Sequence, residues 1–205
     1  GPFKLAEFKP GESYVLERFD NFLRPGRPYL DRVIGVHVKD PSSAEVAFKN
    51  QDLHYAGFNA VFRLKSLPRL EKMKHISLSQ DGYEGIGPLS YLEFNLRKAP
   101  FDNVKVRRAL AYAIDQDFIT QKLQHGLTKP ATGPIHHSSP FYTDDVNKYD
   151  FNIDKANQLL DEAGYPRKDN GTRFSATLDW LPYVFDDHQM VAEYLKPQFK
   201  KIGVD

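Results

Sequence analysis

The sequence contains no cysteine and no long apolar run, and each absence excludes a class of protein. Without cysteine there is no disulfide scaffold, no thiolate metal site and no cysteine nucleophile. No apolar stretch approaches the length of about 18 residues that a membrane-spanning helix requires. The 28 basic and 27 acidic side chains leave a formal net charge of +1. We therefore expect no nucleic-acid partner and no direct insertion of this chain into a membrane.

The signatures of common catalytic and nucleotide-binding sites are also missing. Neither GxxxxGK[S/T] nor GxGxxG occurs, and no GxSxG turn is present for a hydrolase serine. Helical HExxH pairs are absent as well. The adjacent His136 and His137 would point to opposite sides of an extended chain, which makes a shared metal ion difficult. We predict no catalytic residue, no metal site and no cofactor, so an enzyme is the least expected class.

The residues that are present predict a folded chain that mixes strands and helices. Hydrophobic residues make up 40% of the 205 positions and aromatic residues 13%, which is enough for a core in one large domain or two small ones. A hairpin is expected within residues 3–16 and a β-branched strand at 33–38. A run of apolar and aromatic residues predicts a further strand at 89–96, and alternating apolar and polar residues predict one at 174–180. A short β/α alternation is expected within 52–76.

Helices are predicted where apolar residues recur three and four positions apart. The last of them ends near Gly203, whereas the proline-containing stretch 127–150 is predicted to be a long loop. The other helices should begin beside these capping or starting residues: Ser42, Ser43, Asp102, Asp115 and Asp154.

Several stretches, taken in order, resemble the oligopeptide- and dipeptide-binding proteins of peptide ABC transporters, the family 5 extracellular solute-binding proteins. In the strongest match, residues 93–115 (EFNLRKAPFDNVKVRRALAYAID) are similar to the family pattern FNxxKPPFDDVRVRRALAYAID. Further matching stretches lie at 1–18, 31–44, 130–135, 156–166 and 195–204. At residues 50–54 the chain departs from the family's nGeiD turn, because Gln51 stands in place of the glycine and His54 in place of the aspartate.

The resemblance implies an α/β fold of the periplasmic binding protein type (type II, large cluster with an extra domain). The chain stops two residues after Gly203, and we expect it to be a middle fragment that covers parts of both lobes. Residues 1–83 would form part of the first lobe and residues 84–205 most of the second. A connection near residues 83–88, with glycines beside and within it, would absorb a hinge motion.

The resemblance also implies a function: binding a small peptide between two lobes and delivering it to the membrane permease of an ABC transporter. Such a protein is periplasmic, or extracellular and membrane-anchored in a Gram-positive organism. A non-peptide solute (a nickel complex, an oligosaccharide or haem) and a sensor domain of a regulator are the alternatives. By motif position the expected ligand contacts are Tyr91, Glu93 and Asn95, with Tyr183 and His188 as weaker candidates. The alternative for Glu93 is an acid on the exposed face of an edge strand.

Overall fold

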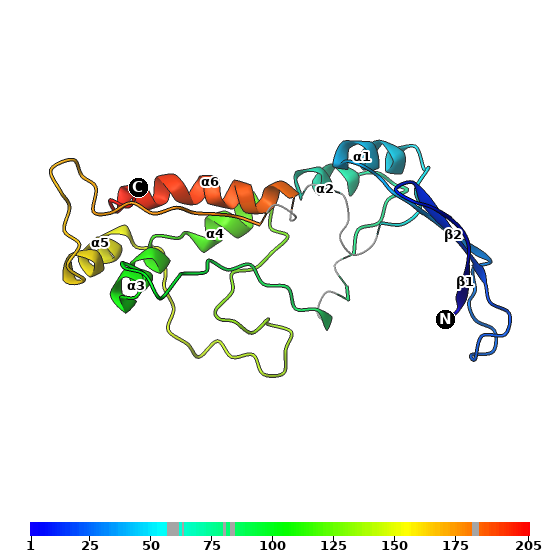
Figure 1. The fold of residues 1–205 in the computed structure, drawn as a ribbon, viewed down its shortest axis with the longest axis horizontal. Helices are drawn as coiled ribbons and strands as arrows, with labels where there is room; N and C mark the ends of the chain where they lie inside the picture. Colours follow the sequence, from blue (N-terminus) through cyan, green and yellow to red (C-terminus); the bar gives the residue numbers. More distant parts are fainter. Residues whose placement is uncertain (57–61, 63, 80, 83–84, 182–184) are drawn as a thin grey trace. The chain divides into compact units, whose positions relative to one another are not determined.

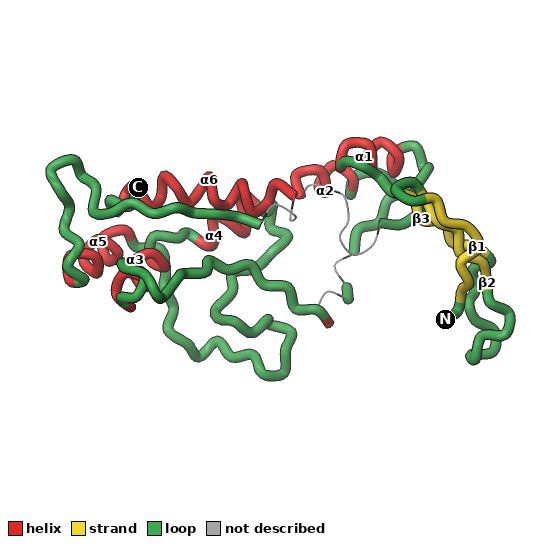
Figure 2. Tube along the Cα trace, viewed as in Figure 1, coloured by secondary structure: helices red, strands yellow, loops and turns green. Residues whose placement is uncertain are grey.

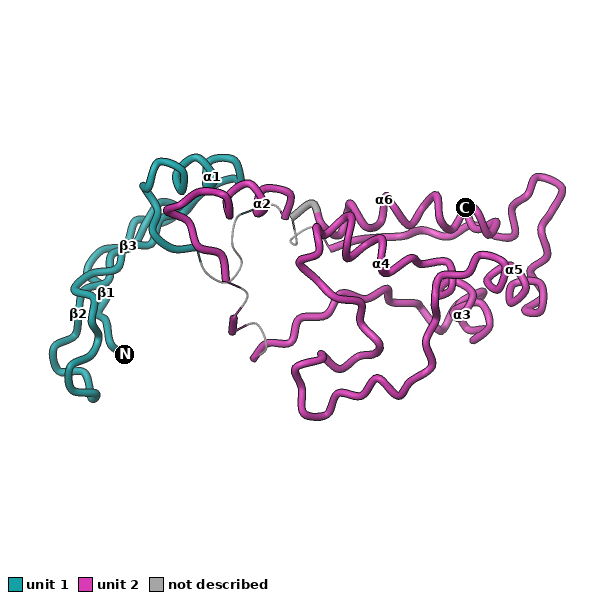
Figure 3. Tube along the Cα trace, turned by 180° about the vertical axis from the view of Figure 1, so that it is seen from behind, with its two compact units in different colours: residues 1–62 teal, residues 63–205 magenta. Residues whose placement is uncertain are grey.

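In the computed structural model, every residue is described except 57–61, 63, 80, 83–84 and 182–184. The chain forms two compact units, residues 1–62 and 63–205 (Figure 3). The division between compact units thus falls at 62/63, whereas we expected a boundary at 83/84. The assignment of these parts to two lobes stays a prediction, as does the hinge near residues 83–88, which lies partly outside the described residues.

The first unit contains an antiparallel sheet of three strands in the order β1-β2-β3 (Figure 1). Strand β1 spans Phe3–Lys9, β2 spans Ser13–Arg18 and β3 spans Arg32–Val36. The turn between β1 and β2 places Gly11 at φ 73°, a conformation that glycine adopts without a steric penalty. The predicted hairpin and the β-branched strand are therefore confirmed.

Helix α1 (Pro41–Lys49) follows the sheet and begins at an aspartate cap. The carboxylate of Asp40 accepts hydrogen bonds from the backbone N–H groups of Ser42 and Ser43, at 2.9 and 3.0 Å. The Ser43 hydroxyl donates to the same carboxylate at 2.6 Å. Our expectation that the serine hydroxyls cap the helix was wrong, because the carboxylate of Asp40, two residues before Ser42, satisfies the free N–H groups instead.

In its described residues, the second unit is helical in its regular structure (Figure 2). In the described part of residues 52–76 the expected strand is absent, and only short helical turns are found. Residues 127–150 form the predicted loop. The helical segments, in chain order, are η1 (Leu64–Ser66), α2 (Leu67–Leu70), α3 (Val104–Tyr112), α4 (Gln116–Phe118), the π-helical η3 (Ile119–Leu123), α5 (Ile153–Glu162) and α6 (Phe185–Lys201).

Helices α3 and α5 pack against each other around the main core cluster. Its members recur at helical spacing on each helix and are joined by two residues that follow α6. The fully buried or nearly buried members of this cluster are Val106, Ala109, Leu110, Ala113, Ala156, Leu160, Ile202 and Val204.

Asparagines cap the helices α3 and α5. The side chain of Asn103 accepts from the N–H of Lys105, and that of Asn152 from the N–H of Lys155, both at 2.8 Å. The expected start residues Asp102 and Asp154 lie one residue before Asn103 and two residues after Asn152. The cap expected at Asp102 was wrong, because the cap is the residue whose extended backbone directly precedes the helix. Helix α5 begins at Ile153, one residue before the start expected at Asp154. Asp115 does cap α4, accepting from the N–H of Phe118 at 2.8 Å.

The stretches 89–96 and 174–180 are not β-strands in this structure. A strand requires a neighbour that pairs with its backbone groups. Among the described residues, the strand pairing of these two stretches is limited to a parallel bridge between Phe174 and Val204. The N–H of Ala176 donates to the carbonyl of Asp205 at 2.8 Å, and the N–H of Asp205 donates to the carbonyl of Phe174 at 3.1 Å. None of the described helices is long and apolar enough to cross a membrane.

Candidate functional site

The segment 91–95 carries three of the expected ligand contacts on one side. The side chains of Tyr91, Glu93 and Asn95 are exposed, with Tyr91 at 81%, whereas Leu92 and Phe94 are partly buried. This alternation follows from an extended backbone, in which successive side chains point to opposite faces. Among the described residues the segment has no strand partner.

Aromatic packing fixes this segment to the core. The ring of Phe94 lies 5.4 Å from that of Phe101, which in turn contacts Phe174 edge-on at 6.3 Å between centroids. Phe174 also meets the ring of Tyr165 at 5.4 Å. The packing of Phe94 on Phe101 fixes the backbone at this position, and the exposed side chains of Glu93 and Asn95 extend from it.

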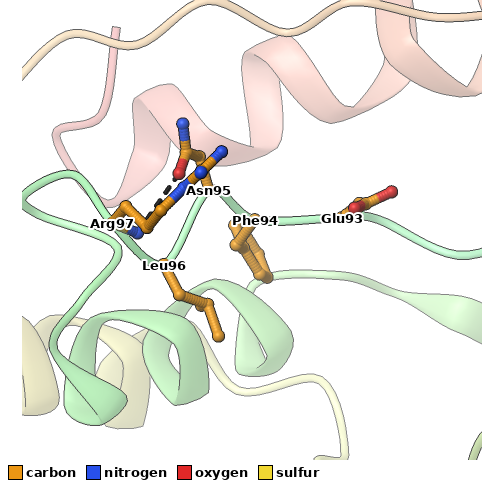
Figure 4. Close-up of a pocket in the computed structure, with 5 residues that line it drawn as sticks. All are labelled: Glu93, Phe94, Asn95, Leu96 and Arg97. Atoms are coloured by element: carbon orange, nitrogen blue, oxygen red, sulfur yellow. Dashed lines mark hydrogen bonds between the residues drawn. The ribbon is translucent and has the colours of Figure 1, made fainter.

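An open hollow of about 510 Å³ is lined by residues 93–97 (Figure 4). The side chains of Asn95 and Arg97 lie on the opposite side of the chain from those of Phe94 and Leu96. The Asn95 side-chain oxygen accepts from the N–H of Arg97 at 3.2 Å, and the Asn95 carbonyl accepts from the N–H of Lys98 at 3.2 Å. These two bonds form a turn that keeps Arg97 beside Asn95.

Arg97 is the residue that the sequence analysis missed at this hollow. The signal was available, since Arg97 continues the two-residue period that begins at Tyr91 and passes through Glu93 and Asn95. The predicted strand ended at Leu96, one residue before Arg97.

The remaining two candidates are Tyr183 and His188. Tyr183 lies outside the described residues. His188 lies in the first half of α6 and is partly buried. Within the described residues, no hydrogen bond or ion pair joins His188 to Tyr91, Glu93 or Asn95, so its role in ligand binding stays a prediction.

The two adjacent histidines lie closer together than we expected. The ring centroids of His136 and His137 are 4.1 Å apart, and the His136 Nδ1 is 2.8 Å from the Ser138 hydroxyl. Our prediction that the rings point to opposite sides was wrong because the chain turns at these residues instead of running extended. Across the described ranges, no three His, Cys, Asp or Glu side chains gather in an arrangement that would hold a metal ion.

Three pKa shifts accompany helix packing in the second unit. A hydrogen bond from Arg173 lowers the pKa of Asp161, and a hydrogen bond from Lys105 lowers the pKa of Glu162. Burial raises the pKa of the Tyr194 hydroxyl, whose ring stacks on Phe118 at 4.8 Å. These shifts result from contacts that hold α3, α5 and α6 in place.

Comparison with curated proteins finds relatives that align with the whole chain. Heme-binding protein A of Haemophilus influenzae is 30% identical over 211 residues, covering 100% of this chain and 36% of that protein. Glutathione-binding protein GsiB of Escherichia coli K12 is 30% identical over 204 residues, covering 100% of this chain and 37% of that protein. The chain thus spans little more than a third of the length of these relatives.

Solved structures show the same fold. The oligopeptide-binding protein AppA of Bacillus subtilis, in complex with a nonapeptide, is 26% identical with a TM-score of 0.71, covering 100% of this chain and 41% of that one. NikA of Brucella suis, in complex with Fe(III)-EDTA, has a TM-score of 0.78 at 23% identity, covering 100% and 42%. The expected periplasmic binding protein fold, with mixed helices and strands, is confirmed.

A family profile agrees with these matches over the full chain. The profile is described as bacterial extracellular solute-binding proteins, family 5 Middle, and it matches residues 1–205. The resemblance found in the sequence is therefore confirmed: the chain belongs to the family 5 bacterial extracellular solute-binding proteins and corresponds to the middle part of such a protein.

Proposed function

We propose that the whole protein is the solute-binding component of an ABC importer, that it binds a small peptide in a cleft between two lobes, and that it delivers this peptide to a membrane permease. The observation that carries the proposal is the family match over residues 1–205 together with the similarity to AppA, which was solved with a nonapeptide. Its place of action would be the periplasm, or the outer surface of a Gram-positive cell.

Tyr91, Glu93 and Asn95 are the ligand contacts that we propose within this chain, with Tyr183 and His188 as further candidates. The exposed side chains of the first three support this role, because they stand beside an open hollow on a backbone packed against the core. An aromatic face, a carboxylate and an amide can together contact a peptide's apolar and polar groups. We propose binding without catalysis.

A non-peptide solute is the second candidate. The relative from Haemophilus influenzae is named a heme-binding protein, and a solved relative, AgaA at 27% identity and a TM-score of 0.71, contains agropinic acid. This family-level similarity therefore extends to proteins whose ligands differ widely in chemistry.

Native mass spectrometry of the full-length protein, purified without denaturation, tests the proposal. We expect a co-purifying mass that fragments into amino acids. Calorimetry should then give heat with a pool of tripeptides to pentapeptides and none with haem or a nickel–histidine complex. A haem or metal-complex adduct without peptide binding would contradict the peptide assignment, and turnover of peptide or ester substrates would contradict a purely binding role.

A further inference from the structure

Asn170 and Gly171 form a dipeptide that occurs once in the sequence, in the stretch that follows α5. Every other asparagine of the chain precedes a residue that carries a side chain. Asn170 is exposed, and Gly171 adopts a φ of 80°. Glycine has no Cβ beside its backbone nitrogen, which leaves that nitrogen unhindered toward the preceding side chain. The dipeptide is therefore a place where the chain can react with itself.

Two backbone hydrogen bonds close the turn around this dipeptide. The N–H of Gly171 donates to the carbonyl of Lys168 at 2.8 Å, and the N–H of Lys168 donates to the carbonyl of Thr172 at 3.1 Å. Glycine occupies the left-handed position that closes such a turn. Because this turn lies at an exposed loop tip, opening it costs less free energy than unfolding the unit. Opening releases the nitrogen of Gly171 from Lys168.

The side chain of Asn170 folds back toward its own backbone. Its Oδ1 accepts a hydrogen bond from the N–H of Thr172 at 3.0 Å, as in an Asx turn. The ring that this bond closes contains both the Cγ of Asn170 and the nitrogen of Gly171, so these two atoms are kept close together. The same N–H stabilises the negative charge that develops on Oδ1 when a nucleophile attacks Cγ.

We propose that Asn170-Gly171 is a site of spontaneous covalent modification, at which Asn170 converts to aspartate and isoaspartate through a cyclic succinimide. Solvent base takes the N–H proton of Gly171, and the nitrogen forms a bond to the Cγ of Asn170. The bond between Cγ and the side-chain amide nitrogen breaks, and this nitrogen takes a proton from water and leaves as ammonia. Water then adds to either carbonyl carbon of the ring and opens it. The balance is water consumed and ammonia released.

Isoaspartate at this position would disturb the contacts of the loop, because its main chain runs through Cγ and gains a methylene before Gly171. The carbonyl of Gly171 accepts from the Nη1 of Arg167 at 2.9 Å and lies 2.9 Å from where a Cβ at Gly203 would be. The Nη2 of Arg167 also donates to the side-chain oxygen of Asn157 on α5 at 3.2 Å. A longer main chain displaces Gly171 from these partners, whereas ordinary aspartate leaves the backbone unchanged.

The test follows the full-length protein during incubation at neutral pH. Trypsin releases the peptide 169–173, and chromatography against synthetic standards separates its asparagine, aspartate and isoaspartate forms. A sample digested before incubation corrects for conversion during digestion. The internal control is Asn147, which is also exposed in a loop but precedes Lys148. Asn170→Gln, whose longer side chain closes the corresponding ring less readily, and Asn170→Asp, which adds the charge without lengthening the backbone, are the control variants.

We expect Asn170 to convert at least about tenfold faster than Asn147, because the nitrogen of Gly171 is unhindered. Both aspartate and isoaspartate should appear. The Tm of the unchanged protein should fall during incubation, as the isoaspartate form accumulates. The Tm of Asn170→Gln should stay at its starting value, and fresh Asn170→Asp should unfold close to the unchanged protein.

Three outcomes would contradict the inference. Equal rates for Asn170 and Asn147 in the folded protein would overturn the site, as would conversion of Asn170 in urea alone. Aspartate without isoaspartate would overturn the cyclic route, since opening of the ring yields both. A Tm that stays the same after full conversion would overturn the predicted effect on the contacts of Gly171. Because none of these measurements uses a ligand, the result is independent of the proposed peptide binding.

Discussion

The buried guanidinium of Arg173 forms an ion pair with the carboxylate of Asp161 on α5. Arg173 is only 4% exposed, and each of its three side-chain nitrogens donates a hydrogen bond. Its Nε donates to the carbonyl of Ile202 at 3.0 Å, its Nη1 to the carbonyl of Tyr165, and its Nη2 to the side-chain oxygen of Asn157 at 3.1 Å. One side chain therefore joins α5 to the chain that follows α6.

Replacing Arg173 with methionine should strongly destabilise the second unit. The substitution retains much of the apolar volume but leaves the buried carbonyl of Ile202 and the carbonyl of Tyr165 without the donor that Arg173 supplies, at a cost of about 3 kcal/mol or more. Urea unfolding measures the change. The control is Lys200→Met, because Lys200 forms an exposed ion pair with Asp205 and should cost less than about 1 kcal/mol. Equal losses for both variants would contradict this role of Arg173.

The Arg173–Asp161 pair also predicts how stability depends on pH. The hydrogen bond from Arg173 lowers the pKa of Asp161 in the folded chain, so the unfolded chain takes up this proton first as the pH falls. The contribution of the pair is fully present above the ordinary aspartate pKa of about 4 and is lost as the pH drops through the folded value. The Tm difference between the unchanged protein and Asp161→Asn should therefore be constant near neutral pH and shrink below about pH 4.

Thermal unfolding at several pH values between neutral and about 2.5 measures this difference. Asp169→Asn is the control, since the Asp169 carboxylate is exposed and has no hydrogen-bond or ion-pair partner in the described part of the chain. A Tm difference for Asp161→Asn that stays the same down to the lowest pH would contradict the predicted linkage.

The hairpin, the strand at 33–38 and helix α3 could be predicted because each depends on residues that are close together in the sequence. A β-turn at Pro10-Gly11 and β-branched residues at 33–38 are sufficient to indicate antiparallel strands. The apolar stripe from Val106 to Ala113 likewise defines the buried face of α3. Cap positions were less predictable because Asp102 and Asn103 are adjacent and chemically equivalent as caps, and only the backbone angles distinguish them.

The strands predicted at 89–96 and 174–180 show where sequence patterns are insufficient. Residues 91–95 still alternate between exposed and partly buried side chains, since this depends only on an extended backbone. Whether the segment is a strand depends on a pairing neighbour, which a local pattern does not specify. Arg97 continues the two-residue period from Tyr91 and was missed because the predicted strand ended one residue earlier, at Leu96.

Gln51 occupies a backbone conformation that favours glycine, at the position where the family turn has one. Its φ is 63°, in the left-handed region that costs a residue with a side chain about 1–2 kcal/mol. Gln51→Gly should remove this cost, partly offset by the greater chain entropy of glycine, for a net gain of up to about 1 kcal/mol. Asn50→Gly is the control: Asn50 has φ −81°, so glycine should destabilise there. Thermal unfolding should show Tm changes of opposite sign, and a fall for both variants would contradict the predicted strain.

Leu160 provides the most direct test of the core between α3 and α5. Its side chain is completely buried in the cluster that includes Val106 and Leu110 from the facing helix. Leu160→Ala removes buried apolar atoms and leaves a cavity, and such substitutions cost about 2–5 kcal/mol. The control is Leu23→Ala in the first unit, where Leu23 is 81% exposed and little apolar surface is lost from the interior. Urea unfolding should show a clearly lower midpoint for Leu160→Ala and almost no change for Leu23→Ala. A similar, small effect for both would mean that α5 does not pack against α3 through Leu160.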